Sequence, residues 1–212
     1  FNGFAEAFLA KFGYSYDPKN NSRDQRFDYR CLISQRVLTD FYQPFSTICH
    51  QVGATSRVQC HGAPTDMLAA YALVDIPESE TLLFDPDFSL LAASAAAMEH
   101  KRLASSETFS CIYGWVPNPA TPPGLKAEKI DDLRCVADAQ FAWGVNRVVW
   151  HGKPYETLDN PNEFYATVHV GPNSALQPYL LPFNAYLATL SEFLSKGEAE
   201  SRLSILLPLE DQ

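Results

Sequence analysis

The chain has 212 residues, of which 46% are hydrophobic and 13% aromatic, and this composition excludes an intrinsically disordered protein. The net charge of −9 argues against a nucleic-acid or anionic-membrane surface, because both require clustered Lys and Arg, whereas a neutral polyhydroxylated ligand is compatible with it. No apolar stretch approaches the ~18 to 20 residues of a membrane span, and the N-terminus lacks the order of a signal peptide. We expect a globular protein, with a secreted or periplasmic location favoured.

Helical patterns dominate the first quarter of the chain. Phenylalanines at near-helical spacing predict a helix over residues 1–14, with Gly13 as its end. A polar loop follows, and a long helix is predicted over residues 29–52, closed by Gly53. Because the chain begins without Met inside the first helical pattern, we expect it to be a piece of a longer protein.

From residue 55 onward, short apolar runs alternate with helical patterns. The predicted strands cover residues 55–62, 72–77, 102–110, 145–152 and 204–209. The predicted helices begin at Pro64 or cover residues 88–100, 126–142 and 182–196. Strands that alternate with helices indicate parallel βαβ units and therefore an α/β fold.

Four strand–helix units amount to half of a (β/α)8 barrel of the TIM type, so we expect only the later units of such a barrel here. We predict one partial barrel domain over residues 1–200 and the start of a following strand or domain over residues 201–212. A half barrel has two open edges that something must cover, and the missing first half of the barrel is the expected partner. An open doubly wound sheet is the alternative.

The five cysteines are odd in number, widely spaced and without a CxxC pair. This pattern disfavours a zinc site and leaves the redox compartment open. We expect them to be small buried side chains.

Polar residues gather at the predicted strand ends, which is where the chemistry of (β/α)8 enzymes lies. Successive strand ends carry Gln59 and His61, then Asp75, Glu78 and Glu80, then Glu107, and then His151. A carboxylate or an imidazole therefore stands at each of four consecutive strand ends. We expect a functional site at this edge of the sheet.

Each of these residues has an ordinary structural alternative. His61 and His151 both precede glycine and could be turn histidines, and Asp75 could cap the turn that follows it. Glu78 and Glu80 could be solvated loop charges. Glu107 is harder to explain in this way, because it ends a run of small and apolar residues with no basic residue close behind it.

Two carboxylates across a pocket are what glycoside hydrolysis uses, one to protonate the leaving oxygen and one to activate water or attack carbon. Aromatic residues that could stack on sugar faces lie near the same strand ends, and core packing is the alternative for each. They are Trp115, Trp143, Trp150, Tyr155, Phe164 and Tyr165. A hard-cation site built from Asp75, Glu78, Glu80 and carbonyl oxygens is also chemically reasonable. The sequence has no GxGxxG, GxxxxGK[ST], HExxH or GxSxG motif.

Three longer segments carry a resemblance: QCHGAPTDMLAAYALVDIPESE, ASAAAMEHKRLASSETFS and FAWGVNRVVWHGKPY. With the flanking FDYRCLIS and PFNAYLATLSEFLSKG, in this order and spacing, they resemble glycoside hydrolase family 106, the α-L-rhamnosidases. The similarity covers nearly the whole chain. As a combination it is specific, although each segment alone is weak.

The resemblance implies a (β/α)8 catalytic domain within a longer multidomain enzyme, inverting hydrolysis of terminal α-L-rhamnosides, and a calcium ion in the active site. It implies that Glu107 is the general base and that Glu78 or Glu80 binds calcium or takes part in proton transfer. The candidate sugar-binding residues are His61, Asp75, His151, Trp150 and Tyr155. The family also uses a carboxylate from the earlier half of the barrel, so this chain lacks part of the implied site.

Two departures from the family stand near the site: a small residue is usual at Glu99 or His100, and Ala is usual at Ser106. Both allow a divergent substrate. Two other functions stay open. One is a non-catalytic carbohydrate-binding half barrel, and the other is a retaining barrel glycosidase for another sugar.

Overall fold

The computed structural model describes residues 23–82, 87–112, 129–152, 168, 170–172 and 174–200. Several predictions fall outside these residues. They are the helix over 1–14, the strand over 204–209, the boundary near residue 201, and the aromatic side chains Trp115, Tyr155, Phe164 and Tyr165.

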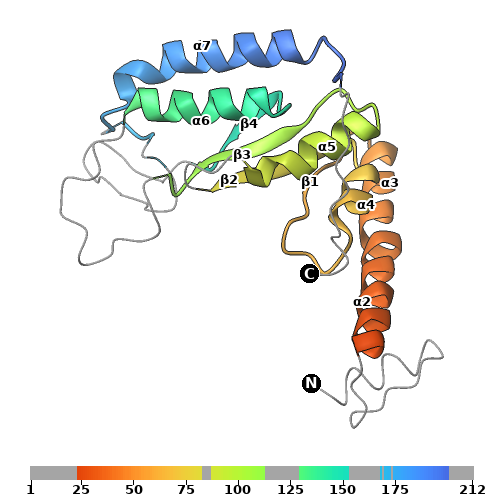
Figure 1. The fold of residues 1–212 in the computed structure, drawn as a ribbon. Helices are drawn as coiled ribbons and strands as arrows, with labels where there is room; N and C mark the ends of the chain where they lie inside the picture. Colours follow the sequence, from red (N-terminus) through yellow and green to blue (C-terminus); the bar gives the residue numbers. More distant parts are fainter. Residues whose placement is uncertain are drawn as a thin grey trace, which may run out of the picture.

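Four parallel strands form one sheet in the order β1-β2-β3-β4, which is also their order in the chain (Figure 1). The strands are β1 (Arg57–Gln59), β2 (Ile76–Leu82), β3 (Ser105–Ser110) and β4 (Arg147–Trp150). The predicted α/β class with parallel strands is therefore confirmed.

One long helical rod precedes the sheet, as predicted, but it begins at Arg23, within the segment that was predicted as a polar loop. It consists of α2 (Arg23–Val37), a π-helical turn η1 (Leu38–Tyr42) and α3 (Gln43–Gln51). Figure 1 shows it standing beside the strands at a steep angle to them. The rod ends at Gly53, whose φ of +73° suits a residue without a side chain. The N–H of Ala54 then bonds back to the carbonyl of Cys49 at 2.8 Å, which closes the helix end.

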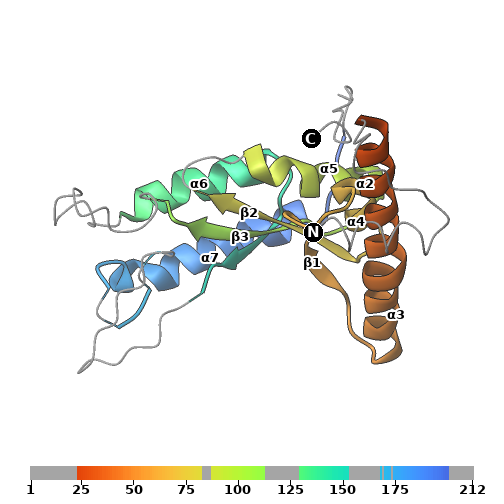
Figure 2. The same cartoon turned by 90° about the horizontal axis from the view of Figure 1, so that it is seen from below.

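Helices follow the four strands in turn, and the first three of them each link one strand to the next. They are α4 (Met67–Ala72), α5 (Leu90–Met98, after the 3-10 turn η2, Asp87–Ser89), α6 (Ile130–Ala142) and α7 (Gln177–Leu194). Asp66 caps α4 by accepting a hydrogen bond from the N–H of Ala69 at 3.1 Å. Figures 1 and 2 show α6 and α7 running side by side along the sheet.

The second strand differs from its prediction. Residues 72–77 were predicted as a strand, but α4 extends to Ala72 and β2 begins only at Ile76. The strand itself is IPESETL, which contains a proline and two glutamates and therefore reads as a loop by composition. It is extended because its neighbours on both sides supply hydrogen bonds and a buried environment. Glu78 and Glu80 thus stand within the strand and are not loop charges.

The last described helix also differs. It was predicted to begin at Pro182, but α7 begins at Gln177 and contains Pro182. Another proline, Pro178, lies in the first turn, where its missing N–H costs nothing.

The sheet has two chemically different faces. Side chains alternate along a strand, and register partners on parallel neighbours share a face. The face toward α6 and α7 carries Ser79, Thr81, Ser106, Thr108 and Trp150, and its serines and threonines are buried. The other face, here called the polar face, carries Arg57, Gln59, Glu78, Glu80, Ser105, Glu107, Arg147 and Val149.

The apolar core lies on the helix side of the sheet. One cluster joins α6, α7 and the end of β3 around Phe109, Leu133, Phe141 and Phe183. A second joins η1, α4 and α5 around Tyr42, Tyr71 and Ala92.

None of the five cysteines, all of which lie in the described residues, forms a disulfide. Cys60 and Cys111 are buried as expected, but Cys31 and Cys135 are exposed, so the expectation of buried thiols is wrong for these two. Among the described residues, no helix has the length and apolar character needed to cross a bilayer.

Candidate carboxylate site on the polar face

The carboxyl ends of the four parallel strands meet at one edge of the sheet. Glu80 and Glu107 are register partners on β2 and β3 there, so their side chains leave the same face from adjacent strands. Just beyond this pair the register shifts, and Phe109 takes a φ of +73°. A bulge at this point turns the chain out of the ladder directly after the two glutamates.

Glu107 is held by a neutral donor. The Gln59 amide donates a hydrogen bond of 3.0 Å to Glu107 Oε2 and lies 3.2 Å from the Ser79 carbonyl, which fixes the amide across β2. On the other side, His151 Nε2 lies 3.8 Å from Glu107 Oε1, beyond hydrogen-bond distance. The Glu107 side chain is 28% exposed. One of its oxygens is therefore oriented by an amide, while the other is open to a water or a substrate.

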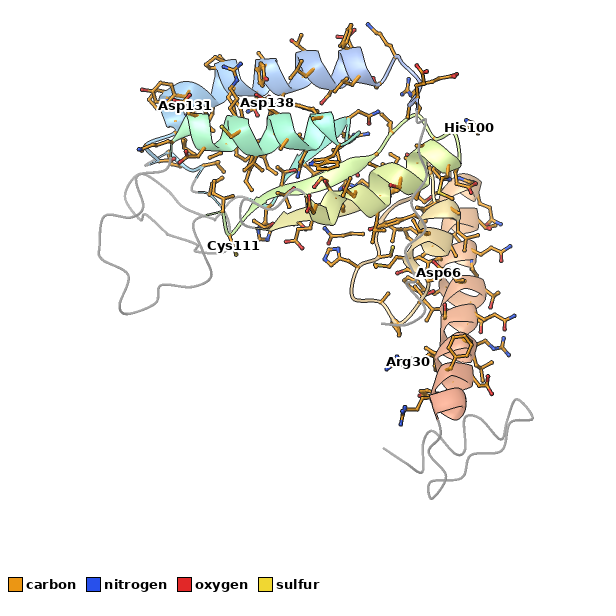
Figure 3. The ribbon with its side chains drawn as sticks, viewed as in Figure 1. Arg30, Asp66, His100, Cys111, Asp131 and Asp138 are labelled. Carbon is orange, nitrogen blue, oxygen red and sulfur yellow. The ribbon has the colours of Figure 1, made fainter. Side chains whose placement is uncertain are left out.

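Glu80 has an imidazole as its partner. His61 Nε2 lies 3.1 Å from Glu80 Oε2, and the Glu80 side chain is 15% exposed. Cys111 is close by, since burial and then the charge of Glu80 raise the pKa of its thiol. Figure 3 shows Cys111 at one end of the sheet and His100 at the other. Glu107, on β3, stands four residues before Cys111 and is the register partner of Glu80, so both glutamates lie toward the Cys111 end.

Glu78 lies two residues before Glu80 on β2 and forms an ion pair with an arginine. Arg57 Nε is 3.1 Å from Glu78 Oε2, and the Ser105 hydroxyl donates to the same oxygen at 2.8 Å. This side chain is buried. The contacts fit a structural ion pair that joins β1, β2 and β3, so the geometry separates Glu78 from the other two glutamates.

Asp75 lies at the opposite edge, before β2 begins. It accepts hydrogen bonds from the Ser56 N–H at 2.6 Å and the Ser56 hydroxyl at 2.8 Å, and His50 Nε2 is 2.9 Å away. Partial burial opposes these bonds, yet together they lower the pKa of Asp75 below its usual value. The structure does not bring Asp75 to the edge that carries Glu107, so its predicted contact with sugar has no support from its position.

The two described tryptophans are also away from the glutamates. Trp150 packs on Phe109 with ring centroids 4.6 Å apart, and its indole N–H donates to Asn184 at 3.0 Å. It therefore belongs to the helix-side core, which was the alternative open for it. Trp143 follows α6 and precedes β4, at the amino edge.

The described residues do not fit a calcium site made of Glu78 and Glu80. Calcium takes six to eight oxygen ligands, but a guanidinium occupies Glu78 and an imidazole occupies Glu80. Within the described residues, no three His, Cys, Asp or Glu side chains come together as a metal site.

Sequence reasoning placed Gln59 at a strand end but did not predict that it orients Glu107. The feature of the sequence that indicated a role for Gln59 was its position, because it stands at the same edge as the glutamates. Gln140, on α6, was missed altogether. A polar residue on an otherwise apolar helix face was the available sign.

Comparison with known proteins adds two similarities. No protein-family model matches the chain. A putative beta-glucuronidase of Formosa agariphila is 25% identical over 175 residues, which cover 74% of this chain and 14% of that protein. A rhamnosidase structure from Novosphingobium sp. PP1Y superimposes with a TM-score of 0.56 and 19% identity, over 82% of this chain and 17% of that chain.

The likeness to the rhamnosidase is one of fold. At 19% identity it shows the arrangement of the chain and nothing finer. The chain spans less than a fifth of the length of either similar protein. What those proteins do as wholes therefore bears on this chain only as a proposal.

Proposed function

We propose that this chain supplies the base-bearing part of a glycoside hydrolase site, and that Glu107 is the base. The observation that carries the proposal is Glu107 itself, a partly exposed carboxylate at the carboxyl edge of a parallel sheet, oriented by a neutral amide and unpaired with Lys or Arg within the described residues. A carboxylate held in this way has an open oxygen for proton abstraction. The names of the two similar proteins, a rhamnosidase and a putative beta-glucuronidase, agree on glycoside chemistry.

The surrounding groups fit this chemistry. His151 is close enough to hydrogen-bond a bound hydroxyl or water beside Glu107, and its Nδ1 is buried without a partner in the described part of the chain. Glu80 and His61 form a second polar pair on the neighbouring strand. Together they offer donors and acceptors on either side of the base, as a sugar ring requires.

The fold that we propose for the parent chain is a (β/α)8 barrel whose first half lies outside these residues. Four strands in chain order without reversal fit a barrel better than a doubly wound sheet, in which the order reverses at the ligand crevice. The polar face would then line the barrel interior. Closure would also cover the outer edges of β1 and β4.

The substrate that we propose is a terminal α-L-rhamnoside, hydrolysed with inversion. Water would attack the anomeric carbon as Glu107 takes its proton, while the bond to the leaving oxygen breaks and a second carboxyl protonates that oxygen. Inversion requires the two carboxyls to be ~6.5 to 9.5 Å apart, whereas adjacent strands are only ~4.8 Å apart. Glu80 is thus too close a neighbour to be the acid, which we assign to the part of the parent chain outside these residues.

Calcium remains a proposal with a narrower basis. A calcium ion in the parent site would need oxygen ligands from segments outside the described residues, because Glu78 is paired with Arg57. Treatment of the parent enzyme with a chelator tests this point separately from the role of Glu107.

The test is hydrolysis of aryl glycosides by the full parent chain. We expect turnover of an aryl α-L-rhamnoside, and we expect Glu107→Gln to lower kcat by about 10³-fold or more, because the amide cannot take a proton. The control is Glu192→Gln, an exposed glutamate on α7 that pairs with Lys196, and it should keep the full rate.

Three outcomes would change the proposal. A parent enzyme that cleaves an aryl β-D-glucuronide instead would keep the site and replace the sugar. A product that retains its anomeric configuration would make Glu80 and Glu107, at their shorter separation, the working pair. Sugar binding without turnover would favour a non-catalytic carbohydrate-binding half barrel. Separately from these three outcomes, full activity of Glu107→Gln would show that Glu107 is not the base.

A further inference from the structure

A buried polar network lies directly behind Glu107, on the helix side of the sheet. Gln140 of α6 is fully buried, and its amide bridges two hydroxyls of β3. Gln140 Oε1 accepts from the Thr108 hydroxyl at 3.1 Å, and Gln140 Nε2 donates to the Ser106 hydroxyl at 3.1 Å. A third hydroxyl, that of Thr81 on β2, lies 3.3 Å from Ser106 Oγ.

The two hydroxyls belong to the residues on either side of Glu107. Because strand side chains alternate, Ser106 and Thr108 point toward α6 while Glu107 points to the polar face. One amide thus ties together the two peptide units that carry the Glu107 side chain. Rotation of the strand at Glu107 would break at least one of these bonds.

The network lies on β3 directly before the strand becomes irregular. The strand leaves regular pairing at the next residue, where Phe109 has a φ of +73° and the register with β2 shifts. The Phe109 side chain is anchored in the aromatic cluster with Trp150 and Phe183. A bulge tends to re-aim neighbouring side chains, so something must hold the preceding residues in regular geometry.

The packing of α6 against the sheet does not require a glutamine at position 140. The rest of this face of α6 is apolar, with Leu133, Val136 and Phe141 in the core cluster. A buried amide costs free energy unless its hydrogen bonds are made, and an apolar side chain of similar length would fill the same volume. The amide of Gln140 is therefore explained by its hydrogen bonds to β3 and not by the packing of the core.

We propose that Gln140 is a positioning residue for Glu107, which it holds in place through Ser106 and Thr108. This inference rests on the proposed function of Glu107 for its kinetic consequence, but not for its structural one. Gln140 does not contact the polar face. It acts by fixing the strand segment from which the base projects.

The kinetic test uses the full parent chain and Gln140→Met, which keeps the length of the side chain and removes both hydrogen bonds. A displacement of ~1 Å at a reacting group can cost about 100-fold, so we expect kcat to fall by roughly 10- to 100-fold with little change in KM. In the Glu107→Gln background the same substitution should cause no further loss, because its effect passes through Glu107. A full additional loss in that background would overturn the proposal.

Two matched sets of controls separate positioning from loss of stability. Leu133→Ala destabilises the same helix without removing a hydrogen-bond partner of Ser106 or Thr108, and it should keep kcat at temperatures where it is folded. Thr108→Ser keeps the hydroxyl that reaches Gln140, whereas Thr108→Val keeps the shape and loses it. We expect the valine variant alone to lower kcat. Equal losses in Leu133→Ala and Gln140→Met, or in both Thr108 variants, would contradict the inference.

A second readout does not depend on turnover. The side-chain amide of Gln59 donates to Glu107, so its nitrogen and proton NMR signals report where the carboxylate lies. Gln140→Met should shift or broaden these signals, and Leu133→Ala should leave them in place. Unchanged Gln59 signals in Gln140→Met would overturn the inference. If the parent chain hydrolyses no glycoside, the proposed function fails while this measurement still decides the role of Gln140.

Discussion

Asp75 joins two segments at the amino edge of the sheet through one carboxylate. Its partners are the Ser56 N–H and hydroxyl before β1 and the His50 ring at the end of α3. Its pKa is lowered on folding, so its stabilisation is present above the unfolded value of ~3.9 and is lost as pH falls through the folded pKa. We expect Asp75→Asn to reduce the free energy of unfolding by about 1 to 2 kcal/mol at pH 7.

The measurement is denaturant unfolding of both proteins between pH 7 and pH 3. The gap between wild type and Asp75→Asn should begin to close below about pH 4, because the carboxylate of the unfolded chain then binds a proton, and it should be lost as pH falls through the lowered pKa of the folded state. Asp40→Asn, on an exposed i,i+4 pair with Arg36, should give a difference of only a few tenths of a kcal/mol. A gap of constant size down to pH 3 would show that the charge of Asp75 does not matter.

The three glutamates of the polar face show which structural roles can be predicted from the sequence and which cannot. Glu78 and Glu80 are two residues apart and read as equivalent in DIPESE. Their difference lies in Arg57, which reaches Glu78 from another strand, and in His61, which reaches Glu80. The register between neighbouring strands determines which residues pair, and this register cannot be predicted from either segment alone.

Among the elements, the strands with β-branched residues were easier to predict than β2. The pattern VNRVVW predicted β4, but IPESETL reads as a loop because its apolar residues do not dominate. Its small hydroxyl residues pack against the helices while its glutamates occupy the polar face. Tertiary burial on one side and the pairs with Arg57 and His61 on the other override β-propensity here.

The end of α5 supplies a prediction at the same scale. His100 closes this helix with a φ of +51°, and the N–H of Lys101 bonds to the Ala96 carbonyl at 2.8 Å. A left-handed conformation costs a residue with a side chain roughly 1 kcal/mol, and glycine is free of that cost. We therefore expect His100→Gly to raise the free energy of unfolding by about 1 kcal/mol.

The neighbouring position provides the control for this change. Glu99 has a φ of −93°, which residues with a side chain adopt without strain. Glycine gains nothing there and loses more backbone entropy on folding, so Glu99→Gly should destabilise the protein by a few tenths to about 1 kcal/mol. Urea unfolding midpoints of the two variants should move in opposite directions. A loss of stability in His100→Gly would mean that its side chain makes a compensating contact.

At the scale of the whole molecule, the order of elements was predictable, whereas the sheet formed by the described residues is open at β1 and β4. Alternating patterns gave four parallel strands, each linked to the next by a helix, and the described residues confirm them. The position of Trp150 in the core could not be foreseen, because its burial depends on α7, far along the chain. Whether β1 and β4 find further neighbours depends on residues beyond those described.

Hydrogen exchange of backbone amides tests that closure. Within the described residues, β1 and β4 each pair on one side only, so in the 212-residue chain their outward amides should exchange faster than those of β2 and β3. In the parent chain a closed barrel pairs both edges, and the outward amides of β1 and β4 should then slow to match the central strands. If the parent leaves either edge in fast exchange, the sheet is open there. The polar face would then be the surface of a doubly wound sheet and not the lining of a barrel, and the second carboxyl of the proposed mechanism would lack a strand to carry it across from Glu107.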